Sequence, residues 1–131
     1  MTILIDTNIA IHLRDRNLAV IGGLAARGAT PTLSIISRIE LDAAVAARPA
    51  DAERLRAGNR ELYRRLSILP FDIPEAEVYA AIIARTGFSR RLVLDRLIAA
   101  TAIVHGLTLV TINGGDFRDI PGLDLEVWPA Q

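Results

Sequence analysis

Acidic side chains stand at places where the apolar runs of this 131-residue sequence end. Four of them share this position: Asp6, Glu40, Asp95 and Asp116. A carboxylate at the edge of a core costs free energy unless another group compensates for its burial, and clustered carboxylates raise one another's pKa. A divalent cation such as Mg²⁺ or Mn²⁺ binds oxygen ligands of this kind. A metal site would therefore account for all four acids at once.

The elements that must position these acids alternate between short β-branched runs and longer helical patterns. The predicted strands cover Thr2–Ile5, Thr32–Ile35, Ser67–Pro70, Thr108–Thr111 and Leu125–Val127. The predicted helices cover Ile9–Arg14, Leu18–Arg27, Ser37–Ala47, Ala52–Leu66, Glu75–Thr86 and Leu94–His105. Nearly continuous apolar strands that alternate with helices indicate a parallel sheet covered on both faces. We therefore predict an α/β fold, a three-layer α/β/α sandwich with a mainly parallel sheet of four to five strands.

The topology of such a sheet brings the acids to one edge, beyond the carboxyl ends of the strands, where ligands bind in open α/β folds. Asp6 directly follows the first strand, and Asp116 lies a few residues past Thr108–Thr111. Glu40 lies early in the helix after the second strand. Asp95 begins the helix that leads into Thr108–Thr111, so it lies far from the start of that strand. All four carboxylates are therefore expected at the same edge.

Each acid also has an ordinary structural interpretation. Asp6 can cap the first helix, and Ser37 and Glu40 have the Ser-x-x-Glu spacing of a capping box. Asp95 can be a helix N-terminal acid that the helix dipole favours, and Asp116 can be a turn residue in a glycine-rich loop. These interpretations are independent of one another, so they do not explain why four acids gather at one edge.

Length and composition exclude several classes of protein. A chain of this size fits one domain, residues 1–131, and its 51% hydrophobic content argues against disorder. No apolar run reaches the ~18–20 residues of a membrane helix, and no basic segment and cleavage site mark a signal peptide. The absence of cysteine excludes disulfides and zinc–thiolate sites. We therefore expect a cytoplasmic protein without a membrane segment. A net charge of zero argues against a general polyanion-binding module.

The motifs around the acids are similar to those of a known family. The matching segments are Leu4–Asn8, Ser34–Leu41, Asp95–Ala102, His105–Thr111, Asn113–Phe117 and Ile120–Leu123. In order and spacing they span nearly the whole chain. The sequence resembles the PIN-domain family, specifically the VapC-like ribonuclease toxins of bacterial and archaeal toxin–antitoxin pairs.

The resemblance implies a Mg²⁺-dependent endoribonuclease that leaves a 5′-phosphate and a 3′-hydroxyl. The family's acidic positions, which hold the metal, match Asp6, Glu40, Asp95 and Asp116, with Asp6 and Asp95 the foremost ligands. The residues beside them in the motifs are expected to orient carboxylates or water, and they are Thr7, Asn8, Thr111 and Asn113. In one departure from the family pattern, Arg96 stands where an acid often follows Asp95.

Arginine supplies every basic side chain, and its planar guanidinium suits phosphate, although genome composition alone also explains this usage. The candidate RNA contacts are Arg14, Arg16, Arg90 and Arg91, which lie close in sequence to the acids. His12 and His105 lack the motif partners of a general base. The isolated aromatic residues are more typical of packing than of base stacking.

The resemblance also implies partners, namely an RNA substrate, a homodimer mate and a separately encoded antitoxin. The first part of the chain carries many apolar residues, which suit either an interface or the core: Ile9, Ile11, Leu13, Leu18, Val20, Ile21 and Leu24.

Three other functions remain open from the sequence. One is a non-toxin PIN nuclease of RNA maturation, and another is a catalytically silent PIN-like binding module, against which the full set of acids argues. The third is a receiver-like or phosphatase domain with Asp6 as phospho-acceptor. Such sites usually contain a lysine, which this chain lacks.

Overall fold

In the computed structural model, which describes residues 1–131, strands and helices alternate along the chain. The strands are β1 (Thr2–Ile5), β2 (Thr30–Ser34), β3 (Ser67–Leu69), β4 (Thr108–Thr111) and β5 (Leu125–Val127). The α-helices are α1 (Thr7–Arg14), α2 (Leu18–Arg27), α3 (Ile35–Ala47), α4 (Ala52–Arg65), α5 (Ile73–Thr86) and α6 (Val93–His105). Two short 3₁₀ helices, η1 (Pro49–Asp51) and η2 (Gly114–Asp116), complete the chain. Every predicted element is present, and no boundary differs by more than two residues.

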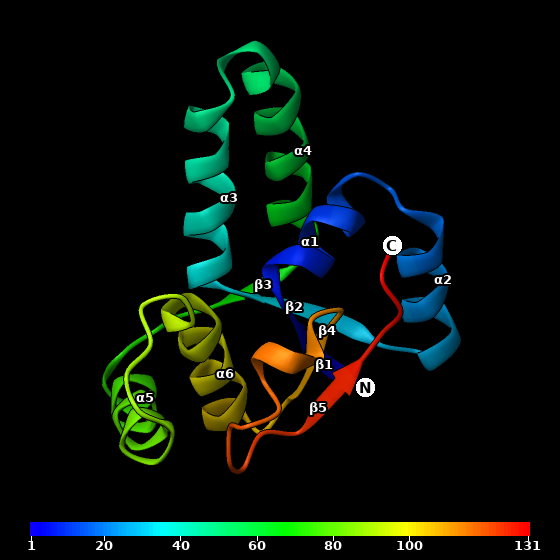
Figure 1. Cartoon of the computed structure of the whole chain (residues 1–131). Coiled ribbons are helices and arrows are strands. Elements are labelled where there is room, and N and C mark those ends of the chain that lie inside the picture. Colours follow the sequence, from blue (N-terminus) through cyan, green and yellow to red (C-terminus); the bar gives the residue numbers. More distant parts are fainter.

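The five strands form one sheet in the order β3-β2-β1-β4-β5, and every neighbouring pair is parallel. β1 lies at the centre, where Ile5 pairs with Leu33 of β2 and with Val110 of β4. Helices cover both faces of this sheet (Figure 1). The predicted α/β/α fold class is therefore confirmed.

Side chains that alternate along the strands build a separate core on each face. Ile3 and Ile5 point into a core completed by α1, α2 and α4. Leu4, between them, points into a second core completed by α5 and α6. Helix α3 contributes to both, with Leu41 in the first core and Ile36 in the second. Because both faces are covered, β1 is apolar at successive positions, as parallel strands usually are.

The start of α3 differs from the capping-box interpretation. The residue that caps this helix is Ser34, whose Oγ accepts a hydrogen bond of 3.0 Å from the backbone N–H of Ile36. Ser37 lies inside the helix and is fully buried. The capping-box interpretation of Ser37 and Glu40 was therefore wrong, because the helix begins two residues earlier than predicted. Both side chains are free for contacts outside the helix.

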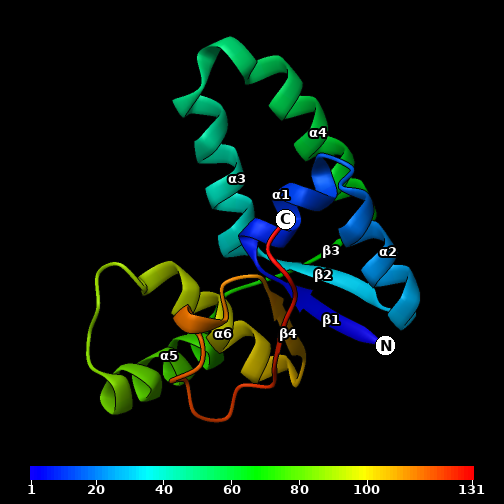
Figure 2. The same ribbon diagram turned by 45° about the vertical axis from the view of Figure 1, so that its right-hand side comes forward.

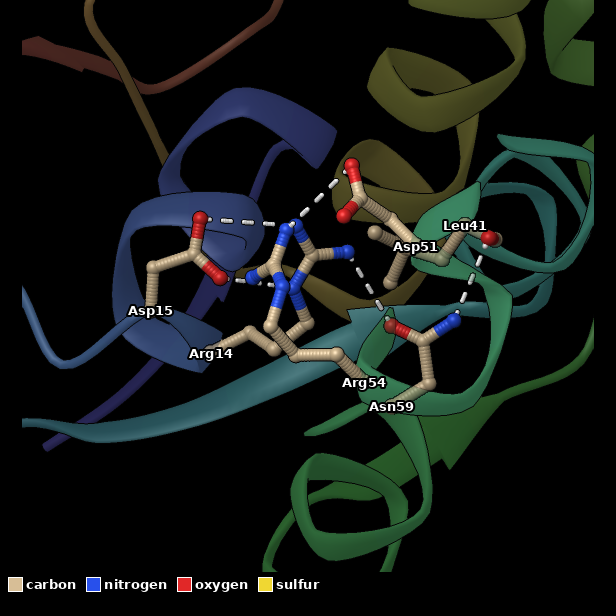
Figure 3. A network of polar contacts seen from close by, with 6 residues as sticks. All are labelled: Arg14, Asp15, Leu41, Asp51, Arg54 and Asn59. Atoms are coloured by element: carbon tan, nitrogen blue, oxygen red, sulfur yellow. Dashed lines mark hydrogen bonds and ion pairs between the residues drawn. The ribbon is translucent and has the colours of Figure 1, made fainter. Parts of the chain in front are cut away.

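Helices α3 and α4, joined by η1, form a hairpin that projects away from the sheet (Figures 1 and 2). A polar network midway along the hairpin ties it to α1 (Figure 3). The Arg14 guanidinium donates to the Asn59 side-chain oxygen at 3.2 Å, and Asn59 Nδ2 donates to the Leu41 carbonyl at 3.2 Å. Asn59 is buried, so it links three helices at one point. Leu41 directly follows Glu40 on α3, so this network lies next to one of the four predicted acids.

None of the helices has both the length and the apolar character that crossing a membrane requires.

Candidate active site

The four predicted acids lie beyond the carboxyl ends of β1, β2 and β4. Asp6 directly follows β1, and Glu40 lies on α3, which directly follows β2. Asp95 lies in the first turn of α6, and Asp116 ends η2 shortly after β4. The pKa of Asp95 is raised to about 6, chiefly by burial. The negative charges of the other three acids raise it as well, in the order Asp116, Asp6, Glu40. The structure therefore brings all four into electrostatic contact.

Asp6 is the most buried of the four, with 3% of its surface exposed. Its Oδ1 accepts a 2.9 Å hydrogen bond from the Ile9 backbone, which caps α1. Its Oδ2 accepts one of 2.5 Å from the Thr111 hydroxyl, whose oxygen in turn accepts from the Asn113 backbone at 2.9 Å. The pKa of Asp6 is nevertheless raised, because burial outweighs these hydrogen bonds. Capping of α1 and a place in the acidic cluster are therefore compatible.

Glu40 is held from α1. The Thr7 hydroxyl donates to Glu40 Oε1 at 2.7 Å, and it also lies 2.8 Å from the hydroxyl of Ser37. Burial raises the pKa of Glu40, the bond from Thr7 partly offsets this, and the charge of Asp6 raises it further. Ser37 was not among the predicted site residues. Its signal in the sequence was a hydroxyl on the apolar face of a helix, three residues before an acid on the same face.

Asp95 and Asp116 are half-buried and differ in the partners they have within the protein. The Asp95 carboxylate makes no hydrogen bond within the protein, so both of its oxygens are available to a ligand. Asp116 Oδ1 forms an ion pair with Arg91, with 3.1 Å between the oxygen and NH1. The positive charge of Arg91 lowers the pKa of Asp95 and so partly offsets burial and the charges of the other acids, which raise it.

The predicted polar neighbours of the acids reach the cluster in different ways. Thr7 and Thr111 donate from their side chains to Glu40 and Asp6. Asn8 and Asn113 instead contribute through their backbones. The backbone N–H of Asn8 donates to the Asp6 carboxylate, and the backbone N–H of Asn113 donates to the Thr111 hydroxyl oxygen. Both asparagine residues are exposed.

The four candidate RNA-contacting arginines are not equivalent. Arg91 is paired with Asp116 at the cluster, and Arg90 beside it is exposed. Arg16 is exposed just after α1. Arg14 is only 8% exposed and its guanidinium binds Asp15 and Asn59, so it belongs to the network of Figure 3. A residue 45 positions away thus engages the Arg14 guanidinium within the protein, and its contact with RNA stays a prediction.

Arg96 is also buried, and it explains the departure from the family pattern beside Asp95. It donates to the Gly87 carbonyl at 2.7 Å and lies 3.6 Å from Asp119. It therefore ties the loop before α6, which contains Arg91, to the loop that follows Asp116 at the end of η2.

The donor set of the cluster fits a hydrated divalent cation. Carboxylate oxygens are the ligands that Mg²⁺ and Mn²⁺ prefer, and Arg91, on Asp116, is the one basic side chain paired with the four acids. No three His, Cys, Asp or Glu side chains lie close enough to form a ready-made metal cage. Electrostatic repulsion among the acids acts over longer distances than metal coordination does. The effect of the other acids on the pKa of Asp95 is therefore compatible with the lack of a ready-made cage. Mg²⁺ usually keeps several waters and needs only one or two carboxylates, which this arrangement supplies.

Comparison with known proteins places the chain in a family. The model of the PIN domain matches residues 3–123. Ribonuclease VapC1 from Rickettsia felis is 47% identical over 62 residues, which cover 45% of this chain and 46% of that protein. The match thus spans about half of the length of that relative. VapC ribonuclease Y4jK from Sinorhizobium fredii is 33% identical over 94% of both chains.

A solved structure has the same fold over the whole chain. The crystal structure of VapBC2 from Rickettsia felis bound to a DNA fragment from their promoter superposes with a TM-score of 0.84 and 27% identity. The superposition covers 98% of this chain and 99% of that one.

Proposed function

This chain belongs to the PIN domain family, and from that premise we propose that it is a divalent-metal-dependent endoribonuclease and the toxin of a toxin–antitoxin pair. Its reaction is the hydrolysis of phosphodiester bonds in RNA, and the support for it is that similar proteins are named VapC ribonucleases. One observation carries the proposal: four acids from distant parts of the chain meet beyond the carboxyl ends of the strands, where burial first, and then the charges of the other three acids, raise the pKa of Asp95 to about 6. A fold places repelling charges together when a cation or a reaction requires them.

The residues that would hold the metal are Asp6, Glu40, Asp95 and Asp116, with Asp6 and Asp95 foremost. The ion is Mg²⁺, with Mn²⁺ as the alternative that the same oxygen ligands accept. When bound, such an ion would lower the pKa of a water molecule and stabilise the negative charge that develops on phosphate oxygens.

The side chains around the acids keep the carboxylates in place. Thr111 and the Ile9 backbone occupy one lone pair on each oxygen of Asp6, so its orientation is set before a ligand arrives. Thr7 does the same for one oxygen of Glu40. Asp95 has no such partner, and a cation beside it would keep it ionised against its raised pKa.

Arg91 provides a positive charge beside Asp116 and Asp95. Because its side chain is exposed and pairs only with Asp116, it can turn toward an RNA phosphate that approaches the acids. Arg16 and Arg90, which are both exposed, are further candidates for phosphate contacts.

The proposed partners are a cognate antitoxin and a second copy of this chain, and the structural relative VapBC2 supports the antitoxin. Most of the apolar residues of the first part of the chain are in the core, but Leu18 is 82% exposed and Ile21 is 40% exposed. These two are available to a partner. We place the activity in the cytoplasm, where cellular RNA is translated, and assign residues 1–131 to one PIN domain.

The test is cleavage of pooled cellular RNA by purified wild type and by Asp95→Asn, each with Mg²⁺ and with EDTA. The expected result is a set of discrete cuts that appear only with wild type and Mg²⁺ and that carry 5′-phosphate and 3′-hydroxyl ends. Cuts that persist in EDTA, or 2′,3′-cyclic phosphate ends, would contradict a metal-dependent hydrolysis by water. Folding of both proteins is checked by circular dichroism.

A further inference from the structure

The buried hydroxyl of Ser37 on α3 forms its hydrogen bond with another helix instead of with its own. Ser37 is completely buried on α3. Two other helical hydroxyls, those of Thr86 and Thr101, donate to the carbonyl four residues earlier in their own helix. Ser37 does not do so, because the residue four positions earlier belongs to β2 rather than to the helix. Its one hydrogen-bond partner is the hydroxyl of Thr7, 30 positions away on α1.

The direction of this hydrogen bond follows from the chemistry of its neighbours. The Thr7 hydroxyl has a single proton, and an ionised carboxylate can only accept. Thr7 therefore donates its proton to Glu40 Oε1, at 2.7 Å. In the 2.8 Å contact between the two hydroxyls, Ser37 must then be the donor. The result is a chain of hydrogen bonds that runs from Ser37 to Thr7 to Glu40.

From this geometry we infer that Ser37 is a positioning residue, which acts through Thr7 to hold Glu40 in the orientation that a divalent cation requires. The inference rests on the proposed function, because it assigns Glu40 to the metal site. The Thr7 hydroxyl can rotate, and its two side-chain partners are Glu40 and Ser37. The proton from Ser37 occupies a lone pair of the Thr7 oxygen, and consecutive hydrogen bonds of this kind strengthen one another. Glu40 Oε1 is then held, and Oε2 remains for the ion.

The arrangement also couples two helices at the acidic edge. Thr7 lies at the start of α1, next to Asp6, while Ser37 and Glu40 lie one turn apart on α3. The hydroxyl pair therefore sets the distance between the carboxylate that follows β1 and the carboxylate that follows β2. Partners of metal ligands commonly change metal affinity or activity by about 10–100-fold when they are removed.

The experiment measures direct Mn²⁺ binding by isothermal titration calorimetry, beside RNA cleavage, for the wild type, Ser37→Ala, Thr7→Val and the double variant. We expect Ser37→Ala to weaken Mn²⁺ binding by about ten-fold. In the Thr7→Val background the same substitution should have no further effect, because the connection is already broken. Ser37→Thr, which keeps the hydroxyl, should bind Mn²⁺ more tightly than Ser37→Ala.

The matched control is Thr101→Val, which removes another fully buried helical hydroxyl whose partner lies within its own helix. It should lower the melting temperature without a change in Mn²⁺ affinity. Wild-type affinity in Ser37→Ala, or effects of Ser37→Ala and Thr7→Val that simply add, would overturn the positioning role. Absence of Mn²⁺ binding and RNA cleavage in the wild type would instead contradict the proposed function, so the two failures are distinct. If Ser37→Ala does not fold, Ser37→Cys, whose thiol is a weak donor, takes its place in the same comparison with and without Thr7→Val, and it should weaken Mn²⁺ binding only when Thr7 is present.

Discussion

Asp95 combines burial, three negative neighbours and no hydrogen-bond donor. Its pKa of about 6 in the folded protein exceeds the value of about 3.9 expected in the unfolded chain. The fold therefore favours the protonated form. This contribution to stability is complete below the unfolded pKa and is lost as the pH rises through the folded pKa. Asp6 and Glu40, whose pKa values are also raised, act in the same direction.

We predict that Asp95→Asn stabilises the metal-free protein at neutral pH while it abolishes RNA cleavage. The amide keeps the shape of the carboxylate and removes the repelled charge. In EDTA, the melting temperature of the wild type should fall between about pH 4 and pH 6, and that of the variant should fall less. Glu77→Gln, at an exposed acid on α5, is the control and should follow the wild type. A variant that melts below the wild type at neutral pH would contradict the assigned repulsion.

At the scale of elements, the position of the acids depends on how helices and short loops are fixed to the sheet. Asn59 joins α4 to α1 and α3, and it binds the carbonyl next to Glu40. Gly114 begins η2, which carries Asp116, in close contact with β5. A Cβ at Gly114 would lie 2.6 Å from Val127 Cγ2 and 2.9 Å from an Arg118 nitrogen.

Replacement of Asn59 by alanine should lower the free energy of unfolding by about 1–3 kcal/mol, because it removes the buried amide that accepts from Arg14 and donates to the Leu41 carbonyl. Urea denaturation measures this change. Arg60→Ala, at the next and exposed position of α4, is the matched control and should stay near wild type. Equal effects of the two substitutions would show that the Asn59 network contributes nothing specific.

Replacement of Gly114 by alanine should also destabilise the protein, by about 1–3 kcal/mol, because the new methyl group has no space against Val127. It should reduce RNA cleavage too, since η2 must move and carries Asp116 with it. Gly115→Ala is a close control, because nothing lies within 4 Å of a Cβ at that position. Thermal melts and cleavage rates of the two variants are compared. Loss of activity in Gly115→Ala but not in Gly114→Ala would contradict the predicted effect of the contact with Val127.

At the scale of the whole molecule, the candidate site exists only in the folded chain. Its acids span residues 6–116, and the hydrogen bond between Thr111 and Asp6 joins positions 105 residues apart. A cation that binds this site therefore binds the native state and not the unfolded chain. Such binding stabilises the fold by an amount that grows with the ratio of ion concentration to Kd, about 2.7 kcal/mol at a ratio of 100.

Addition of Mg²⁺ should accordingly raise the melting temperature of the wild type at neutral pH. The increase should be smaller below about pH 6, because protons compete with the cation for Asp95. Differential scanning fluorimetry with Mg²⁺, and with NaCl at the same ionic strength as control, measures both. An equal increase with NaCl would point to general screening of the repelled acids instead of a bound ion.

The sequence by itself determined the order of the elements, the parallel sheet between helices and the edge at which the acids meet. It could do so because strand burial and helical periodicity are local properties that the residue types record. It also singled out the four acids, because charges at the ends of apolar runs stand out in the chain, and their role in binding a metal stays a prediction. Only the tertiary structure decided which side chains meet. Arg14 and Arg91 look alike in sequence, but one is buried against Asn59 and the other pairs with Asp116. The partner of Ser37 was equally hidden, because contacts between residues 30–105 positions apart depend on how the helices pack on the sheet.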